Sequence, residues 1–129
     1  MPESKATILV VDDSPEVANI VKIVLQQGGY EVVLAADGQE GLEKAQAEQP
    51  DLIVLDVMMP VLDGFAVCRR LRKDPQLKHT PVILLTAVGE HIHDTDYPAD
   101  GVLQADADEY IEKPVDPKML LAAVGRLLS

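Results

Sequence analysis

Residues 52–64 read LIVLDVMMPVLDG, a run of four apolar residues that ends in the carboxylate of Asp56. The apolar residues show no polar alternation, which is typical of a strand buried on both faces of a parallel sheet. Burial of an unpaired carboxylate costs free energy, so Asp56 either reaches water or has a chemical role at the end of that strand. The stretch therefore indicates both a type of strand and a candidate functional residue.

On both sides of this stretch, short apolar runs alternate with amphipathic segments. The runs that we interpret as strands are residues 7–11, 30–35, 51–56, 81–87 and 109–113. The segments that we interpret as helices are residues 15–27, 37–49, 64–73 and 117–129, and residues 88–108 are ambiguous. This order predicts an α/β fold of the (βα)5 type, a doubly wound parallel five-stranded sheet with helices on both faces and an atypical fourth helix region.

Helix-terminal residues and apolar spacing support these assignments. Ser14 and Asp116 are predicted N-caps before Pro15 and Pro117, which suit the first helical position. Helical spacing predicts which residues three of the helices bury. They are Val17, Ile20, Val21, Val24 and Leu25 in the helix 15–27; Phe65, Val67, Cys68 and Leu71 in the helix 64–73; and Leu120, Leu121, Val124 and Leu127 in the helix 117–129. The basic cluster Arg69, Arg70, Arg72 and Lys73 is expected to be a solvated helix face, with docking of an acidic partner as the alternative.

Composition narrows the class of protein. The 129 residues fit one domain, so we expect a single domain over residues 1–129. The net charge of −11, from 22 acidic and 11 basic residues, argues against direct nucleic-acid binding. No apolar run approaches the length of a membrane span, and the first residues do not resemble a signal peptide, so we expect a cytoplasmic protein with no membrane contact. Cys68 is the only cysteine, which excludes an internal disulfide.

Polar side chains gather where the predicted strands end, which is where open α/β sheets bind ligands. Asp12 and Asp13 follow the first strand, and Asp56 ends the third. Three converging carboxylates repel one another, so either some of them are protonated or a cation lies between them. A hard divalent ion is favoured, and Mg²⁺ suits oxygen ligands and phosphoryl groups. Thr86 ends the fourth strand and Lys113 the fifth, adding a hydroxyl and a positive charge. Together these groups indicate a phosphoryl-transfer site in which Asp56 forms an aspartyl phosphate.

Each of these residues also has an ordinary structural interpretation. One of Asp12 and Asp13 could cap the helix before Pro15, and Asp56 could be a turn residue. Thr86 alone fits a β-branched strand residue, and Lys113 alone fits a solvated lysine. Their joint position at one end of different strands favours the site.

At this point the sequence resembles the receiver domain of two-component response regulators. The motifs ILVVDDSP (8–15), LIVLDVMMPVLDG (52–64), PVILLTA (81–87) and YIEKP (110–114) carry the resemblance over nearly the whole chain. It implies a flavodoxin-like fold with strand order 2-1-3-4-5, and a phosphohistidine of a histidine kinase or phosphotransfer protein as phosphodonor to Asp56. It also implies an unidentified downstream protein partner and a monomer in the unphosphorylated state.

The resemblance further implies the role of each site residue. Mg²⁺, or Mn²⁺ in its place, would be held by Asp13, Asp56 and the backbone carbonyl of Met58, with Asp12 acting through a water. Lys113 would pair with the phosphoryl group, and Thr86 would swing to bond it while the switch aromatic Tyr110 turns inward. The Lys113–Pro114 bond would be cis, and Gly64 would permit an unusual backbone conformation.

Two departures from the family pattern affect these expectations. Met58 and Val88 stand where polar side chains can orient the hydrolytic water, which predicts slow autodephosphorylation. The segment 88–110 is several residues longer than usual for the family. Residues 86–112 contain eight acids and no lysine or arginine. Within them, HIHDTD (91–96) could suggest a metal site or a pH-sensitive loop, but an ordinary loop is favoured.

Two other classes of function compete with the phosphoacceptor receiver. The first is a receiver used mainly as a protein-interaction module, which the presence of all five reactive side chains makes less favoured. The second is an aspartyl-phosphate phosphatase, which usually carries a second aspartate two residues after the nucleophile. That position is Met58 here, so we expect self-phosphorylation and autodephosphorylation rather than an enzyme acting on separate substrates.

Overall fold

A computed structural model describes residues 5–60, 62–86 and 107–129. Its helices and strands follow in the order β1 (Thr7–Val11), α1 (Pro15–Gln27), β2 (Glu31–Ala35), α2 (Gly38–Glu48), β3 (Leu52–Asp56), α3 (Gly64–Lys73), β4 (Val82–Thr86), β5 (Glu109–Glu112) and α5 (Pro117–Leu128). Each element lies within about one residue of its predicted bounds where the structure describes them. Of the ambiguous region over residues 88–108, where the atypical fourth helix was expected, residues 88–106 lie outside the described residues.

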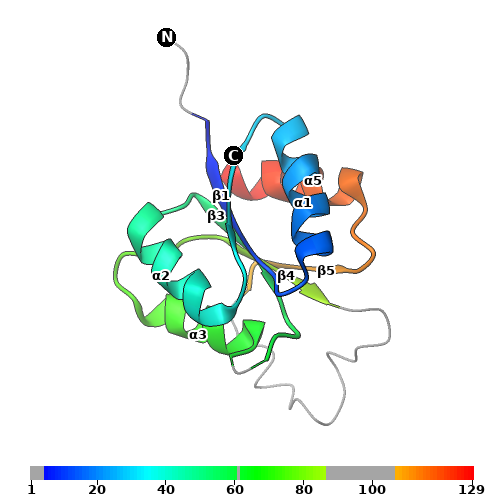
Figure 1. The fold of residues 1–129 in the computed structure, drawn as a ribbon. Helices are drawn as coiled ribbons and strands as arrows, with labels where there is room; N and C mark the ends of the chain where they lie inside the picture. Colours follow the sequence, from blue (N-terminus) through cyan, green and yellow to red (C-terminus); the bar gives the residue numbers. More distant parts are fainter. Residues whose placement is uncertain (1–4, 61, 87–106) are drawn as a thin grey trace.

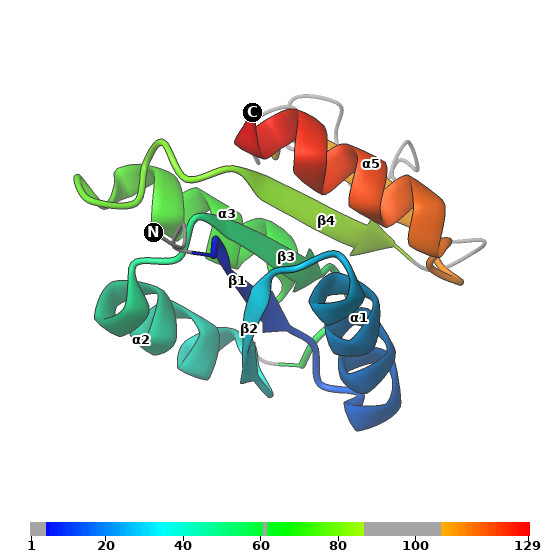
Figure 2. The ribbon, with the colours of Figure 1, turned by 90° about the horizontal axis from the view of Figure 1, so that it is seen from above.

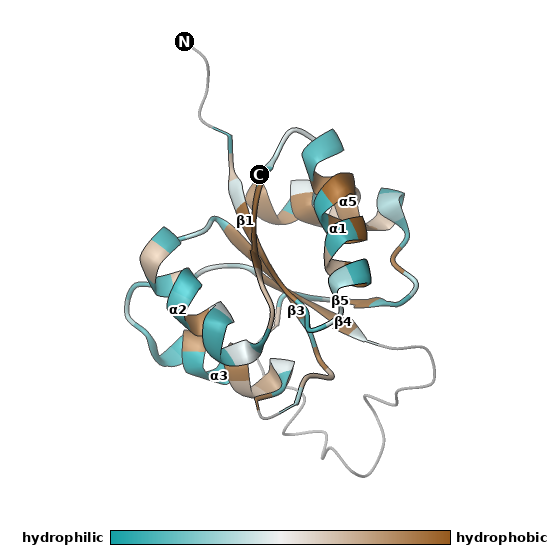
Figure 3. Cartoon of the chain, in the orientation of Figure 1, coloured by the Kyte–Doolittle hydropathy of each residue, from teal (hydrophilic) through white to brown (hydrophobic). Residues whose placement is uncertain are grey.

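The five strands form one parallel sheet in the order β2-β1-β3-β4-β5, which confirms the predicted fold class and strand order. Helices α1 and α5 cover one face, and α2 and α3 cover the other (Figures 1 and 2). This arrangement explains why the strands lack polar alternation, since both of their faces are buried. The brown strands between helices with teal outer faces in Figure 3 show the same layering.

Successive strand residues point into two separate cores. In β1, Leu9 and Val11 pack on the α2–α3 side, while Ile8 and Val10 pack on the α1–α5 side. Cys68 is fully buried in the α2–α3 core, as predicted. The alternation fixes which side chains reach each face, because a one-residue shift of a strand would exchange the two faces.

Helix starts agree with the sequence, but some burial does not. Ser14 and Asp116 are the N-caps of α1 and α5, as predicted. The prediction that Ile20 is buried is wrong: its side chain is 53% exposed, and Ala18 lies in the core instead. The apolar stripe of α1 is wider than its contact with the sheet, so Ile20 at the stripe's edge remains in solvent. Leu121 and Leu127 of α5 are half-buried for the same reason.

Two expectations about backbone geometry have different outcomes. The Lys113–Pro114 peptide is cis, as predicted. The reason given for Gly64 is wrong, because among the described glycines only Gly29 has a positive φ. Gly64 is needed for space instead: a Cβ there would lie 2.5 Å from the backbone oxygen of Asp56. The start of α3 thus packs directly on the end of β3.

Candidate phosphoacceptor and metal site

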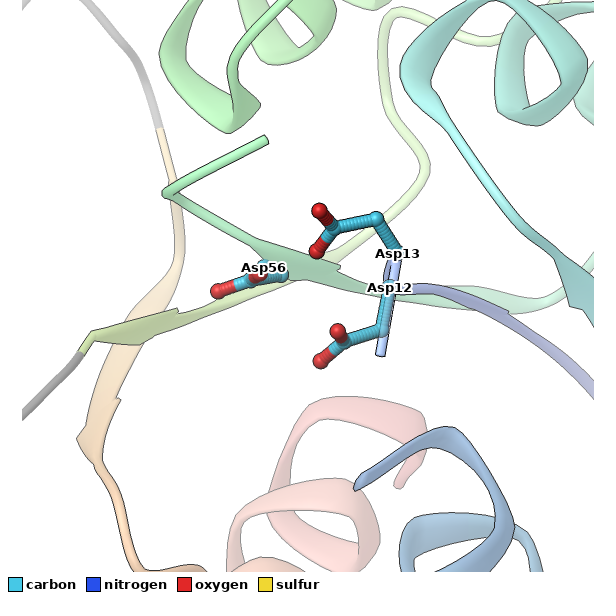
Figure 4. Close-up of side chains that lie close together, drawn as sticks. All are labelled: Asp12, Asp13 and Asp56. Atoms are coloured by element: carbon cyan, nitrogen blue, oxygen red, sulfur yellow. The ribbon is translucent and has the colours of Figure 1, made fainter. Parts of the chain in front are cut away.

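The ends of β1 and β3 bring three carboxylates together. Asp12 and Asp13 directly follow β1, Asp56 is the last residue of β3, and the two strands are neighbours in the sheet. Asp12 and Asp56 are buried, with 2% and 3% of their surface exposed, whereas Asp13 is exposed. Figure 4 shows the three side chains projecting from these adjacent strand ends. One oxygen from each lies within 4.8 Å of the other two.

Backbone N–H groups hold two of these carboxylates in place. The N–H of Ser14 donates to Asp12 Oδ1 at 2.8 Å, so the residue that caps α1 also orients Asp12. The N–H of Met58 donates to Asp56 Oδ1 at 3.4 Å. These short-range bonds follow from the turns after β1 and β3, and they fix the directions in which both acids point.

Lys113 supplies the positive charge that the sequence predicted. Its Nζ lies 3.0 Å from Asp56 Oδ1, to which it donates a hydrogen bond, and 3.5 Å from Asp12 Oδ2. Burial lowers the pKa of Lys113, but the hydrogen bond to Asp56 and the charges of both aspartates outweigh burial and raise the pKa. The lysine therefore stays protonated and bridges the ends of β3 and β5.

One ammonium does not balance three carboxylates. At about 5 Å and an effective dielectric of about 20, each carboxylate pair costs on the order of 3 kcal/mol. Burial raises the pKa of Asp12, and the charge of Asp56 raises it further, against the bond from Ser14. Asp12 Oδ2 is also buried and accepts no hydrogen bond from the described residues. This buried oxygen has the shared Lys113 ammonium at 3.5 Å but no hydrogen bond from the described residues, and we call it unbonded in that sense. Its place beside two further carboxylates fits a hard divalent cation such as Mg²⁺.

Thr86 and Tyr110 lie on the same face of the sheet. Thr86 is the last residue of β4 and is buried, and β4 pairs with β3 so that Leu85 lies opposite Asp56. Tyr110 lies opposite Leu84 in the β4–β5 pairing, two residues before Thr86, and its half-buried ring packs against the α2–α3 core. Residues two apart on a strand share a face, so Thr86 lies on the side of the sheet where Tyr110 packs.

A cavity of about 600 Å³ opens next to the carboxylates. It lies between the start of α1 and the end of β2, and its walls include Asp12, Asp13, Glu16, Leu34 and Glu40. The cavity therefore reaches Asp12 and Asp13 from the side of α1, while Asp56 is not among its walls.

The sequence matches the response regulator receiver domain over residues 8–125. The chain belongs to this family. It is 45% identical over 121 residues to the DNA-binding dual master transcriptional regulator RpaA of Synechocystis, a match that covers 94% of this chain and 48% of RpaA. The receiver domain resembles a putative response regulator from Chloroflexus aurantiacus, with a TM-score of 0.86, 36% identity, and coverage of 97% and 98% of the two chains.

A second solved structure bears on the cation. The receiver domain of sensor histidine kinase PA1611 from Pseudomonas aeruginosa was solved with a magnesium ion coordinated in its active site cleft. It matches this receiver domain with a TM-score of 0.82 and 28% identity, covering 97% of this chain and 98% of that one. The family and the acidic cluster together agree with the predicted class of cofactor.

The receiver domain spans about half the length of the curated relatives that it matches first. Those relatives are named as transcriptional regulators rather than as conventional enzymes. Within the described residues, no helix has the length and apolar character that crossing a lipid bilayer requires.

Sequence reasoning missed a second charged group, at the opposite end of the sheet. Arg72 was expected on a solvated helix face, but its side chain is only 15% exposed and pairs with Asp108 at 3.0 Å. The expectation for Arg72 is therefore wrong, while Arg69, Arg70 and Lys73 are exposed as predicted. The pairing of Arg72 with Asp108 was hard to predict from sequence, because Asp108 is the last residue of a segment without helical or strand periodicity.

Proposed function

We propose that this receiver domain accepts a phosphoryl group on Asp56 from the phosphohistidine of a histidine kinase or phosphotransfer protein. The observation that carries the proposal is the pairing of buried Asp56 with Lys113 at 3.0 Å, beside the unbonded oxygen of Asp12. Family membership supports the same role for the site. We propose that residues 1–129 act as one such domain.

In the proposed reaction, a carboxylate oxygen of Asp56 attacks the phosphorus atom. A P–O bond forms as the P–N bond to the donor histidine breaks, and the electron pair of that bond returns to the ring nitrogen. The other nitrogen of the donor ring is already protonated before transfer, so the imidazole leaves as a neutral molecule. Lys113, kept protonated by its acidic neighbours, balances negative charge on the phosphoryl oxygens, and this electrostatic positioning is the main contribution of the protein.

A divalent cation completes the proposed site. Asp13, Asp56 and the backbone carbonyl of Met58 would hold Mg²⁺, with Asp12 acting through a water, and Mn²⁺ could replace Mg²⁺. The support is the set of three carboxylate oxygens within 4.8 Å and the unbonded Asp12 Oδ2. When bound, the ion supplies positive charge that neutralises phosphoryl oxygens.

Phosphorylation would then be read through Thr86 and Tyr110. The added charge of roughly −1.5 to −2 attracts hydroxyl and ammonium donors, which favours movement of Thr86 toward the phosphoryl group. Tyr110 packs on the face that Thr86 would vacate, so its ring can follow. We expect Thr86→Ala to accept the phosphoryl group but to lose the change at the Tyr110 ring, measured by NMR of fluorotyrosine-labelled protein.

We also propose that the phosphorylated state is long-lived. Met58 is 56% exposed beside the site and offers no hydrogen bond from its side chain to orient a hydrolytic water. Val88, the second residue behind this expectation, lies outside the described residues. We expect Met58→Asn to shorten the phosphoprotein's half-life several-fold, while Met119→Asn, an equally exposed methionine on α5, leaves it unchanged. Loss of the phosphoryl group within seconds in the unaltered protein would contradict slow autodephosphorylation.

The decisive experiment is incubation with acetyl phosphate and Mg²⁺, followed by intact mass measurement. We expect one added phosphoryl group on the unaltered protein and none on Asp56→Asn, which keeps the shape of the side chain. Removal of Mg²⁺ with a chelator is expected to suppress the adduct. An adduct that persists in Asp56→Asn, or no adduct in the unaltered protein, contradicts the proposal.

The proposed partners follow from the family and from charge. A histidine kinase or phosphotransfer protein would deliver the phosphoryl group, a downstream protein would recognise the switched state, and the unphosphorylated domain would be monomeric and cytoplasmic. The relative RpaA, which is named as a DNA-binding regulator, does not support the expectation of no nucleic-acid contact. That expectation rests only on the charge of −11 and applies to these residues alone.

A further inference from the structure

At the amino edge of the sheet, where the parallel strands begin, lies a charged pair, Arg72 and Asp108, that the proposed reaction does not use. Arg72 in the last turn of α3 donates from Nη2 to Asp108 Oδ2 at 3.0 Å. Its Nη1 donates to the carbonyl oxygens of Thr80 at 2.6 Å and Lys78 at 3.2 Å. One guanidinium therefore links α3, the connection into β4 and the residue just before β5.

Asp108 also bonds to the first residue of β4 in two ways. Its Oδ2 accepts from the N–H of Val82 at 2.8 Å, and its own N–H donates to the Val82 carbonyl at 2.8 Å. The same carboxylate oxygen thus receives a backbone donor and the Arg72 guanidinium. Such charge-assisted bonds are stronger than neutral ones, and they hold Asp108 opposite Val82.

This alignment matters because β5 is a short edge strand. Within the described sheet it has four residues and pairs only with β4. The pair of Asp108 and Val82 continues the register in which Glu109 lies opposite Ile83. A slip of one residue would turn each β5 side chain to the other face, and a slip of two would carry Lys113 about 6 to 7 Å along the sheet.

Lys113 lies directly after β5, at the other end of the strand from Asp108. Its N–H donates to the Thr86 carbonyl at 2.6 Å, and its ammonium reaches Asp56. The carboxylates of the metal site come from β1 and β3, whose pairing does not involve β5. A change in the register of β5 would therefore displace the lysine and leave the metal ligands in place.

We propose that Arg72 and Asp108 are positioning residues that set the register of β5 and thereby place the Lys113 ammonium on Asp56. The consequence for phosphoryl transfer rests on the proposed function, whereas the register itself does not. The two residues act from the far end of the strand, about 16 Å from Lys113 along five residues of extended chain.

The first test separates cation binding from phosphoryl transfer in Asp108→Ala. The affinity for Mg²⁺ alone, measured by titration calorimetry, is expected to stay equal or to rise, because the metal ligands stay in place while the Lys113 ammonium moves away from Asp12 and Asp56. The rate of adduct formation with acetyl phosphate is expected to fall about tenfold, because the lysine is misplaced. Asp108→Asn keeps an oxygen for the Val82 N–H and should recover part of the rate.

Glu109→Gln is the matched control for these variants. Its carboxylate stands one residue further along the same strand but pairs with Arg126 Nη2 of α5 at 2.7 Å. Its rate is expected to stay within about twofold of the unaltered protein, because the pairing of Asp108 with Val82 is intact. Equal losses of rate in Glu109→Gln and Asp108→Ala would show a general effect of β5 charge and overturn the proposal.

A second measurement does not depend on phosphorylation. In Asp108→Ala, hydrogen exchange at the Lys113 amide is expected to accelerate about tenfold relative to the β3 amides, which report general destabilisation. Unchanged relative protection at Lys113, or a parallel loss of Mg²⁺ affinity and rate, would overturn the proposal. An unaltered protein that takes no phosphoryl group contradicts the proposed function, and the exchange measurement still decides whether Asp108 sets the register.

Discussion

Charge is unbalanced at the carboxyl edge of the sheet, where the strands end, and balanced at the amino edge, where they begin. At the carboxyl edge, Asp12, Asp13 and Asp56 share a single ammonium, and one buried oxygen accepts no hydrogen bond from the described residues. At the amino edge, Arg72 and Asp108 balance each other and also bond backbone groups. Balanced charges stabilise a fold, whereas an excess of one sign raises its free energy until a ligand of opposite charge binds. The difference supports the proposal that the carboxyl edge binds a cation.

The largest expected effect on stability tests how rigidly the carboxyl edge is built. Gly64→Ala places a Cβ 2.5 Å from the Asp56 backbone oxygen, and we expect the free energy of unfolding to fall by about 3 kcal/mol. Gly125→Ala in α5 is the control, because a Cβ there meets no atom within 4 Å. The control should gain up to about 1 kcal/mol from helix propensity. Equal stability of the two variants in urea denaturation would contradict close packing at Gly64.

Removal of a carboxylate at the amino edge should destabilise the domain. Asp108→Ala leaves the Arg72 guanidinium and the Val82 N–H without this acceptor, at an expected cost of about 1 to 2 kcal/mol. Urea denaturation monitored by circular dichroism measures this cost. An unchanged midpoint would mean that water replaces both bonds.

Removal of a carboxylate at the carboxyl edge should have the opposite sign. Asp12→Asn keeps an oxygen for the Ser14 N–H and relieves repulsion by Asp56, so without Mg²⁺ we expect a gain of about 1 kcal/mol. The same variant should bind Mg²⁺ about tenfold more weakly. Thermal unfolding with and without Mg²⁺ measures both effects. A loss of stability without Mg²⁺ would show that attraction of Asp12 to Lys113 exceeds the repulsion.

The smallest effect concerns an exposed network at the start of α2, which borders the cavity but is not part of the carboxylate cluster. Asp37 accepts from the Glu40 N–H at 2.8 Å, and Glu40 accepts from the Ala36 N–H at 2.7 Å and pairs with Lys44 at 3.1 Å. The bond from Ala36 lowers the pKa of Glu40, with Lys44 adding to the shift. We expect Glu40→Gln to cost about 0.5 kcal/mol at neutral pH.

The pH dependence of this cost has a defined sign. A lowered pKa means that the ionised carboxylate stabilises the fold above the pKa of an unfolded glutamate, and that the stabilisation is lost as pH falls through the lowered value. The difference in unfolding free energy between Glu40→Gln and the unaltered protein should therefore vanish in acid. Glu43→Gln, on the same helix, is the control, and a difference that grows in acid would contradict the assignment.

Most of the fold was predictable because its signals are local. The apolar runs without alternation gave the strands, and Ser14, Pro15, Asp116 and Pro117 marked where two helices begin. Burial at the margin was not predictable, since the contact between a helix and the sheet is narrower than its apolar stripe. Ile20 is exposed for that reason.

The location of the candidate site was predictable from strand order. The pair of Arg72 and Asp108 at the other end of the sheet was not predictable. Parallel strands bring their carboxyl ends to one edge, so residues at three strand ends had to meet there. No comparable rule predicts the pairing of Arg72 with Asp108, because it joins the end of a helix to a residue outside any periodic segment. The roles of the site residues in phosphoryl transfer remain predictions.

The sequence by itself determined the strands and the helix starts, because periodicity and capping depend on neighbours along the chain, and it supplied the candidate site residues. Only the tertiary structure decided the distance from Lys113 to Asp56, the unbonded oxygen of Asp12 and the bonds of Asp108. These depend on register between strands far apart in sequence, which no local pattern specifies. Gly64 illustrates the difference. The sequence indicated that this position requires glycine, and the structure showed the reason, which is the close approach of the Asp56 backbone.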